Sequence, residues 1–80
     1  MLRGEPQLLS LRMLAHLETL YRARGLRVSD VAAQVGVSNR AMKRYLNGCG
    51  VTLDLLERLC VVADVSILEL ARLAEGDRNL

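Results

Sequence analysis

Residues 25–48 read GLRVSDVAAQVGVSNRAMKRYLNG and decide the fold of this chain. The stretch begins and ends with glycine and has a further glycine, Gly36, in its middle. Glycine commonly ends a helix because it adopts the left-handed conformation without strain. We therefore expect a short helix over about 29–35, a tight turn at Gly36, and a second helix that starts at Ser38 and stops at Gly48.

The second of these helices is predicted to have one polar and one apolar face. Successive residues turn by about 100° around a helix, so its long polar side chains fall within an arc of about 140°. Ala41, Met42 and Tyr45 fall on the opposite side and can pack against the preceding helix. The polar face consists of Asn39, Arg40, Lys43, Arg44 and Asn47. Amide and guanidinium groups read the edges of DNA bases, and an ammonium group neutralises phosphate.

One further helix is expected before this pair and one after it. Apolar residues recur at helical spacing from about Gln7 to Arg24, where Gly25 ends the pattern. The apolar side of this helix consists of Leu9, Met13, Leu14, Leu17, Leu20 and Tyr21. After the central pair, Thr52 is predicted to cap a helix over about 53–63. Its buried row consists of Leu56, Leu59, Cys60 and Ala63.

A last helix is predicted near the end of the sequence. Ser66 and Glu69 have the spacing of a capping box, in which each side chain bonds a backbone amide near the other residue. Val65 and Leu70 complete it as a hydrophobic staple. We expect this helix to run over about 67–75 and to end at Gly76.

The composition fits one small all-α domain. The chain has 80 residues, of which 51% are apolar, and it contains no phenylalanine or tryptophan. A core of leucine, valine, alanine, methionine and isoleucine suits helices packed on helices, and this length allows one modest core. We therefore expect a single five-helix domain over residues 1–80, with a helix-turn-helix motif over about 29–47 and a polar tail over 77–80.

Charge is distributed unevenly along the chain. The formal net charge is +2, yet residues 19–53 carry six cations and one acid, which gives +5. Residues 54–80 carry six acids and three arginines, which gives −3. A concentrated basic patch is how a protein holds a polyanion, although a basic helical surface can also be merely solvated.

Several classes of function are disfavoured by the sequence. No apolar run is long enough for a membrane span, and the first residues lack the pattern of a signal peptide, so we expect a cytoplasmic protein. Cys49 and Cys60 form no CxxC pair and His16 stands alone, which predicts no disulfide, no metal site and no cofactor. A nucleophile beside a base is not suggested by any spacing, so we do not expect an enzyme.

The central motif and its flanks resemble the phage-repressor helix-turn-helix family, with its lambda-repressor-like and Cro-like fold. The resemblance covers roughly residues 17–73. Its most specific parts are the small Ala32, where the two helices cross closely, the turn at Gly36, and the caps that bracket the fourth helix. The residues that carry it are the run 25–38, then Met42, Tyr45, Gly48, Thr52, Leu53 and the run 63–67.

The resemblance implies sequence-specific binding of double-stranded DNA in transcriptional control, with the second helix of the motif in the major groove. The residues that it implies for base contacts are Asn39, Arg40 and Arg44. The residues expected on phosphates are Lys43, Arg27, Ser38 and Asn47. Two copies related by a two-fold axis would bind a near-palindromic operator.

The sequence departs from the family pattern at three places. Val28 stands where a glutamine often holds a phosphate, and Arg27 is the candidate to replace it. The loop 48–51 carries no cation where family members tend to have basic residues. Asp64 replaces a common glycine, and aspartate tolerates the left-handed conformation better than most residues.

A homodimer is also expected, because the chain has more apolar residues than one small core can bury. The residues predicted to be left over are Leu8, Leu11, Ile67, Leu70, Leu73 and Ala74.

An alternative function uses the same five helices as a protein-interaction module, such as an antitoxin or adaptor whose basic helix binds an acidic partner. Salt-dependent DNA binding distinguishes this alternative from a DNA-binding protein, because only phosphate neutralisation gives a steep loss of affinity with salt.

Cys49, between two glycines at the edge of the proposed DNA face, is either a plain thiol or an oxidation-sensitive one.

Overall fold

A computed structural model describes residues 8–78, with the side chains of residues 8–76, and contains the five predicted helices. No strand occurs within this described part of the chain. The chain is therefore all-α, as the sequence predicts. The helices are α1 (Leu9–Ala23), α2 (Val28–Val35), α3 (Asn39–Leu46), α4 (Leu53–Val62) and α5 (Ile67–Arg78).

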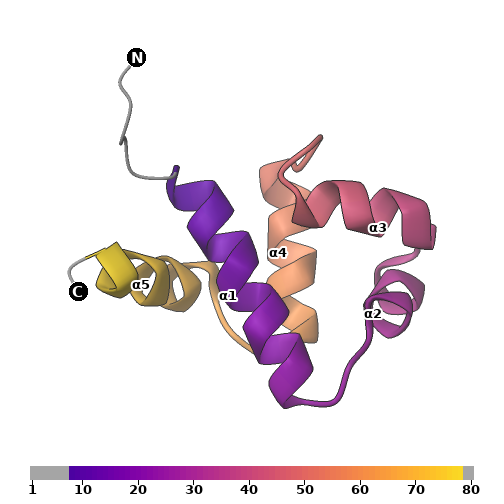
Figure 1. Ribbon diagram of the computed structural model, residues 1–80, viewed down its shortest axis with the longest axis horizontal. Helices are drawn as coiled ribbons and strands as arrows, with labels where there is room; N and C mark the ends of the chain where they lie inside the picture. Colours follow the sequence, from indigo (N-terminus) through magenta and orange to yellow (C-terminus); the bar gives the residue numbers. More distant parts are fainter. Residues whose placement is uncertain (1–7, 79–80) are drawn as a thin grey trace.

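The helices surround one core (Figure 1). α2 and α3 lie at one end of the molecule, α5 lies at the other, and α1 and α4 cross the middle between them. α1 packs against α5 and α3, and α4 packs against α2 and α5. The molecule measures 37 × 24 × 21 Å along its principal axes. The helix pair of the motif is thus held away from α5 by the two central helices.

The core confirms the apolar sides predicted for α1 and α4. Leu17 and Leu59 have no exposed surface, and Tyr21 is 4% exposed. The Tyr21 hydroxyl donates to the backbone carbonyl of Leu59 at 2.6 Å, which links α1 to α4. Burial raises the pKa of this phenol well above its usual range, so it remains a donor at any ordinary pH.

Side-chain caps start three of the helices where the sequence predicts them. The hydroxyls of Ser38, Thr52 and Ser66 each accept from the backbone amide three residues later, at 3.0, 3.1 and 3.0 Å. Such a cap satisfies an amide that the first turn otherwise leaves without a partner. Asp64 has a φ of 59°, which confirms the left-handed conformation expected for it.

The end of α5 differs from the prediction. The helix continues through Gly76 to Arg78, so Asp77 and Arg78 are helical and do not belong to a tail. Glycine weakens a helix interior by only about 1 kcal/mol relative to alanine, which does not force an end. The other helix boundaries agree with the predictions within one or two residues, and the predicted start at Gln7 lies outside the described residues.

The predicted surplus of apolar surface is only partly correct. Leu70 and Ala74 have no exposed surface because α5 packs them into the core, and Leu11 and Ile67 are half-buried against it. Arg12 stabilises the packing of α1 against α5, because its Nε donates to the Ala74 carbonyl at 3.2 Å. Among residues 8–76, the large apolar residues that are exposed are Leu8, Leu53, Val61, Leu68 and Leu73.

Candidate nucleic-acid interface

α3 has the two faces that the sequence predicts. Met42 is completely buried, Tyr45 is half-buried against the core, and Ala41 is half-buried. The residues of the opposite face are all exposed: Asn39, Arg40, Lys43, Arg44 and Asn47. The apolar face holds the helix to the protein, so the polar face is presented outward as a unit.

The turn before α3 sets the angle at which the helix leaves α2. Gly36 has a φ of +86°, and the amides of Gly36 and Val37 both donate to the carbonyl of Ala32, at 2.8 and 3.0 Å. These bonds close the end of α2 in the left-handed manner expected of a glycine cap. Val31 and Ala32 are 1% exposed, so a small side chain lies at the close contact of α2 with its neighbours.

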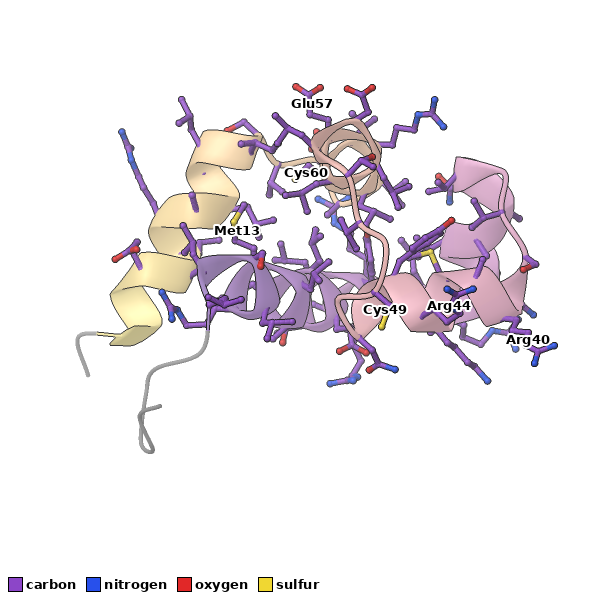
Figure 2. The ribbon with its side chains drawn as sticks, turned by 90° about the horizontal axis from the view of Figure 1, so that it is seen from above. Met13, Arg40, Arg44, Cys49, Glu57 and Cys60 are labelled. Carbon is purple, nitrogen blue, oxygen red and sulfur yellow. The ribbon has the colours of Figure 1, made fainter. Side chains whose placement is uncertain are left out.

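The cations of α3 have no carboxylate partner in the part of the chain that the structure describes. Among the side chains of residues 8–76, none forms an ion pair with Arg40, Lys43 or Arg44. In Figure 2, Arg40 and Arg44 follow one another along α3, while Glu57 of α4 points to the opposite edge of the view. Glu57 therefore lies away from Arg40 and Arg44, and the α3 face is available to an anion.

Ser38 and Asn47 mark the two ends of α3. The Ser38 hydroxyl oxygen caps the helix, and its O–H remains a potential donor. Asn47 is the C-cap residue, and its backbone amide donates to the Lys43 and Arg44 carbonyls. Both side chains are exposed beside the cations, where the sequence predicts phosphate contacts.

Arg27 lies at the start of α2 and is partly engaged. Its side chain is 83% exposed, and its Nε lies 3.6 Å from Oδ2 of Asp30. The same carboxylate oxygen accepts from the Arg27 backbone amide at 2.8 Å, which caps α2. This cap is not among the sequence predictions, although an acidic residue at the third position of a helix is a recognisable signal. A phosphate that binds the guanidinium group of Arg27 would therefore compete with Asp30 for it.

The loop after α3 has two glycines in the left-handed region and no cation. Gly48 and Gly50 have φ values of 91° and 77°, and a Cβ on Gly48 would lie 2.6 Å from Leu11 Cδ2. Cys49 is exposed between them, and its amide donates to the Arg44 carbonyl at 3.0 Å. Both glycines are needed here for their conformation, and Gly48 is also needed for the close approach to Leu11 of α1.

The remaining reactive side chains do not form a site. Cys60 is 2% exposed, and burial, together with the nearby Glu57, raises the pKa of its thiol, which makes it a poor nucleophile. His16 is half-buried on α1. Within the described residues, no three His, Cys, Asp or Glu side chains are grouped so that they could hold a metal ion. None of the described helices is long and apolar enough to cross a membrane.

A short helix that is packed on its predecessor through a glycine turn and exposes amides and guanidinium groups is the arrangement of a helix-turn-helix DNA-binding protein. The chain belongs to the Cro/C1-type helix-turn-helix DNA-binding domains, since the model of that family matches residues 16–75. DNA binding is thus the activity of this class of domain. Comparison with curated proteins and with solved structures gave no match.

Proposed function

We propose that this protein binds double-stranded DNA sequence-specifically and regulates transcription, with α3 in the major groove. The observation that carries the proposal is the exposed face of α3, whose three cations lack carboxylate partners among the described residues. B-DNA's major groove is about 12 Å wide and admits one helix with its side chains.

The residues on this face have different roles. Asn39, Arg40 and Arg44 contact base edges, because an arginine fork fits guanine and an asparagine amide fits adenine. Lys43 neutralises phosphate as a point charge without a fork. The further phosphate contacts are Arg27, Ser38 and Asn47.

The operator is near-palindromic in this proposal, and the protein binds it as a homodimer. Two α3 helices related by a two-fold axis would enter successive major grooves about 34 Å apart. The five large apolar residues that are exposed in the described part of the chain provide surface from which a dimer interface can be made.

The test begins with selection of bound duplexes from a random pool, which gives the half-site, its spacing and its symmetry together. Binding of the selected and a scrambled duplex is then measured by fluorescence anisotropy at several salt concentrations. We expect a steep salt dependence for both duplexes, because counterions are released from each neutralised phosphate, and much tighter binding of the selected duplex.

A pair of matched double variants assigns the effect to α3. Arg40→Gln with Arg44→Gln should abolish the preference for the selected duplex. Arg58→Gln with Arg72→Gln removes the same charge from exposed positions on α4 and α5 and should preserve the preference. Salt-insensitive, sequence-independent behaviour of the wild type would instead favour a module that binds an acidic protein.

A further inference from the structure

One pocket adjoins the C-terminal end of α3. It has a volume of about 260 Å³ and is formed by the second half of α1, the start of α2 and the last residue of α3, Leu46. Its apolar lining includes Tyr21 and Val31. Its charged lining residues are Glu18, Arg22 and Arg27. Cations from two other helices are therefore brought next to the proposed DNA-reading helix.

Arg22 is the cation of this pocket that lies outside the ion pairs of the described residues. It is exposed on the last turn of α1, and no described side chain forms an ion pair with it. Arg24, two residues later, is 3.8 Å from Asp64, and Arg27 is 3.6 Å from Asp30. Glu18 lies one helical turn before Arg22 and contributes a negative charge. Because the pocket is lined by two arginines and one glutamate, its charged residues still sum to a positive charge.

The other segment that adjoins the end of α3 offers nothing comparable. Residues 45–57 contain no lysine or arginine, and their two charged residues are Asp54 and Glu57. A helix in the major groove has a phosphate backbone on either side of it. Among the described residues, Arg22 and Arg27 are the cations that share a pocket with this end of α3.

We infer that the rim of this pocket is a binding site for a backbone phosphate of DNA, with Arg22 as its principal ligand and Arg27 as a second. The inference rests on the proposed function and adds α1 to the elements that hold DNA. These phosphate contacts consequently lie on the α1–α2 side of α3, and the loop after α3 supplies none.

The experiment compares Arg22→Gln with Arg24→Gln on the selected and the scrambled duplex over a range of salt concentrations. The control variant removes the same charge two residues away, from a side chain already paired with Asp64. One lost phosphate contact should flatten the slope of log affinity against log salt by about 0.9. At 0.1 M salt this corresponds to about an eightfold loss of affinity for both duplexes alike.

Further variants and a chemical footprint sharpen the test. Arg22→Lys should restore the slope, because a phosphate accepts a point charge as well as a fork. Glu18→Gln should strengthen binding to both duplexes. Ethylation interference should show one phosphate that blocks wild-type binding and no longer affects the Arg22→Gln variant. Thermal unfolding of each variant verifies that the fold is kept.

Two results would overturn the inference without touching the proposed function. One is wild-type slope and affinity for Arg22→Gln, and the other is an equal loss for Arg24→Gln, which would mean that only overall charge matters. A wild-type protein with no salt-dependent DNA binding would overturn the proposed function itself and this inference with it.

Discussion

At the scale of single residues, the cations of α3 differ in what they can recognise. Arg44 carries a planar fork that can bond two acceptors of one guanine, whereas Lys43 carries a point charge. Both are exposed, and neither has an ion-pair partner among the described side chains. Their exposure and charge are alike, so a difference between them in binding would arise from chemistry and position on the helix.

We expect Arg44→Ala to lower the affinity for the selected duplex by roughly 1–3 kcal/mol and to relax the preference at one base pair. Lys43→Ala should weaken all duplexes alike and reduce the salt slope by about one. Anisotropy titrations with single-base variants of the selected duplex measure both effects. If Arg44→Ala kept the wild-type ratio between selected and scrambled duplexes, its assignment to base reading would be wrong.

Tyr21 gives a second prediction, which concerns pH. Its pKa is raised by burial, so the folded state holds the phenolic proton more tightly than the unfolded state does. This contribution to stability is complete below about pH 10, the ordinary pKa of tyrosine, and is lost progressively as the pH rises above that value. Cys60 acts in the same direction, starting from its own lower ordinary pKa.

The variant Tyr21→Phe isolates this effect. It removes the 2.6 Å hydrogen bond to Leu59 and should cost about 1 kcal/mol at neutral pH. The difference in unfolding free energy between wild type and variant, measured by urea denaturation, should shrink from pH 8 to pH 11. A constant difference over this range would show that the phenol does not titrate differently in the folded state.

At the scale of helices, the sequence predicts beginnings better than ends. A hydroxyl that caps a first turn acts on the amide three residues later, so Ser38, Thr52 and Ser66 reveal three helix starts without knowledge of the fold. The end of α5 depends instead on what its last turns pack against. Leu70 and Ala74 are buried by α1 and the core, and that long-range packing is not visible in a local pattern.

The glycines of α2 and α5 give an element-scale prediction. A Cβ would meet nothing within 4 Å at either Gly36 or Gly76, but only Gly36 has a positive φ, of +86°. We expect Gly76→Ala to stabilise the protein by up to about 1 kcal/mol, because alanine favours the helix and restricts the unfolded chain. Gly36→Ala should destabilise it by about 1–2 kcal/mol through left-handed strain.

Urea denaturation of both glycine variants measures these shifts, with the wild type as reference. The two variants add the same methyl group at equally open positions, so the backbone conformation is what distinguishes them. Loss of stability in Gly76→Ala would mean that the helix does not continue through this position in solution.

The α3 face could be predicted from sequence because amphipathic spacing alone separates Met42 from its exposed neighbours. The pocket beside it could not. Arg22 and Leu46 are distant in sequence, and only the packing of α1 against α3 brings them to one pocket. The ion pair between Arg27 and Asp30 was likewise hidden, because it depends on side-chain geometry.

At the scale of the whole molecule, the position of α5 bears on how two copies could bind one operator. α5 and α3 lie at opposite ends of a molecule whose longest dimension is 37 Å. Two α3 helices about 34 Å apart would each lie about 17 Å from a two-fold axis. Contact through α5 would place the axis at the far end from α3, which the length of the molecule allows.

We therefore predict that the homodimer forms through α5, where Leu68 and Leu73 are 73% and 42% exposed. Leu68→Glu or Leu73→Glu should shift sedimentation from dimer toward monomer and weaken binding to a palindromic site more than to a half-site, because a charge would be buried in an apolar contact. Val61→Glu adds the same charge at a 76% exposed position on α4 and should leave the dimer intact. A wild-type monomer at high concentration, both free and on DNA, would exclude the dimer, and dissociation by Val61→Glu alone would move the interface to α4.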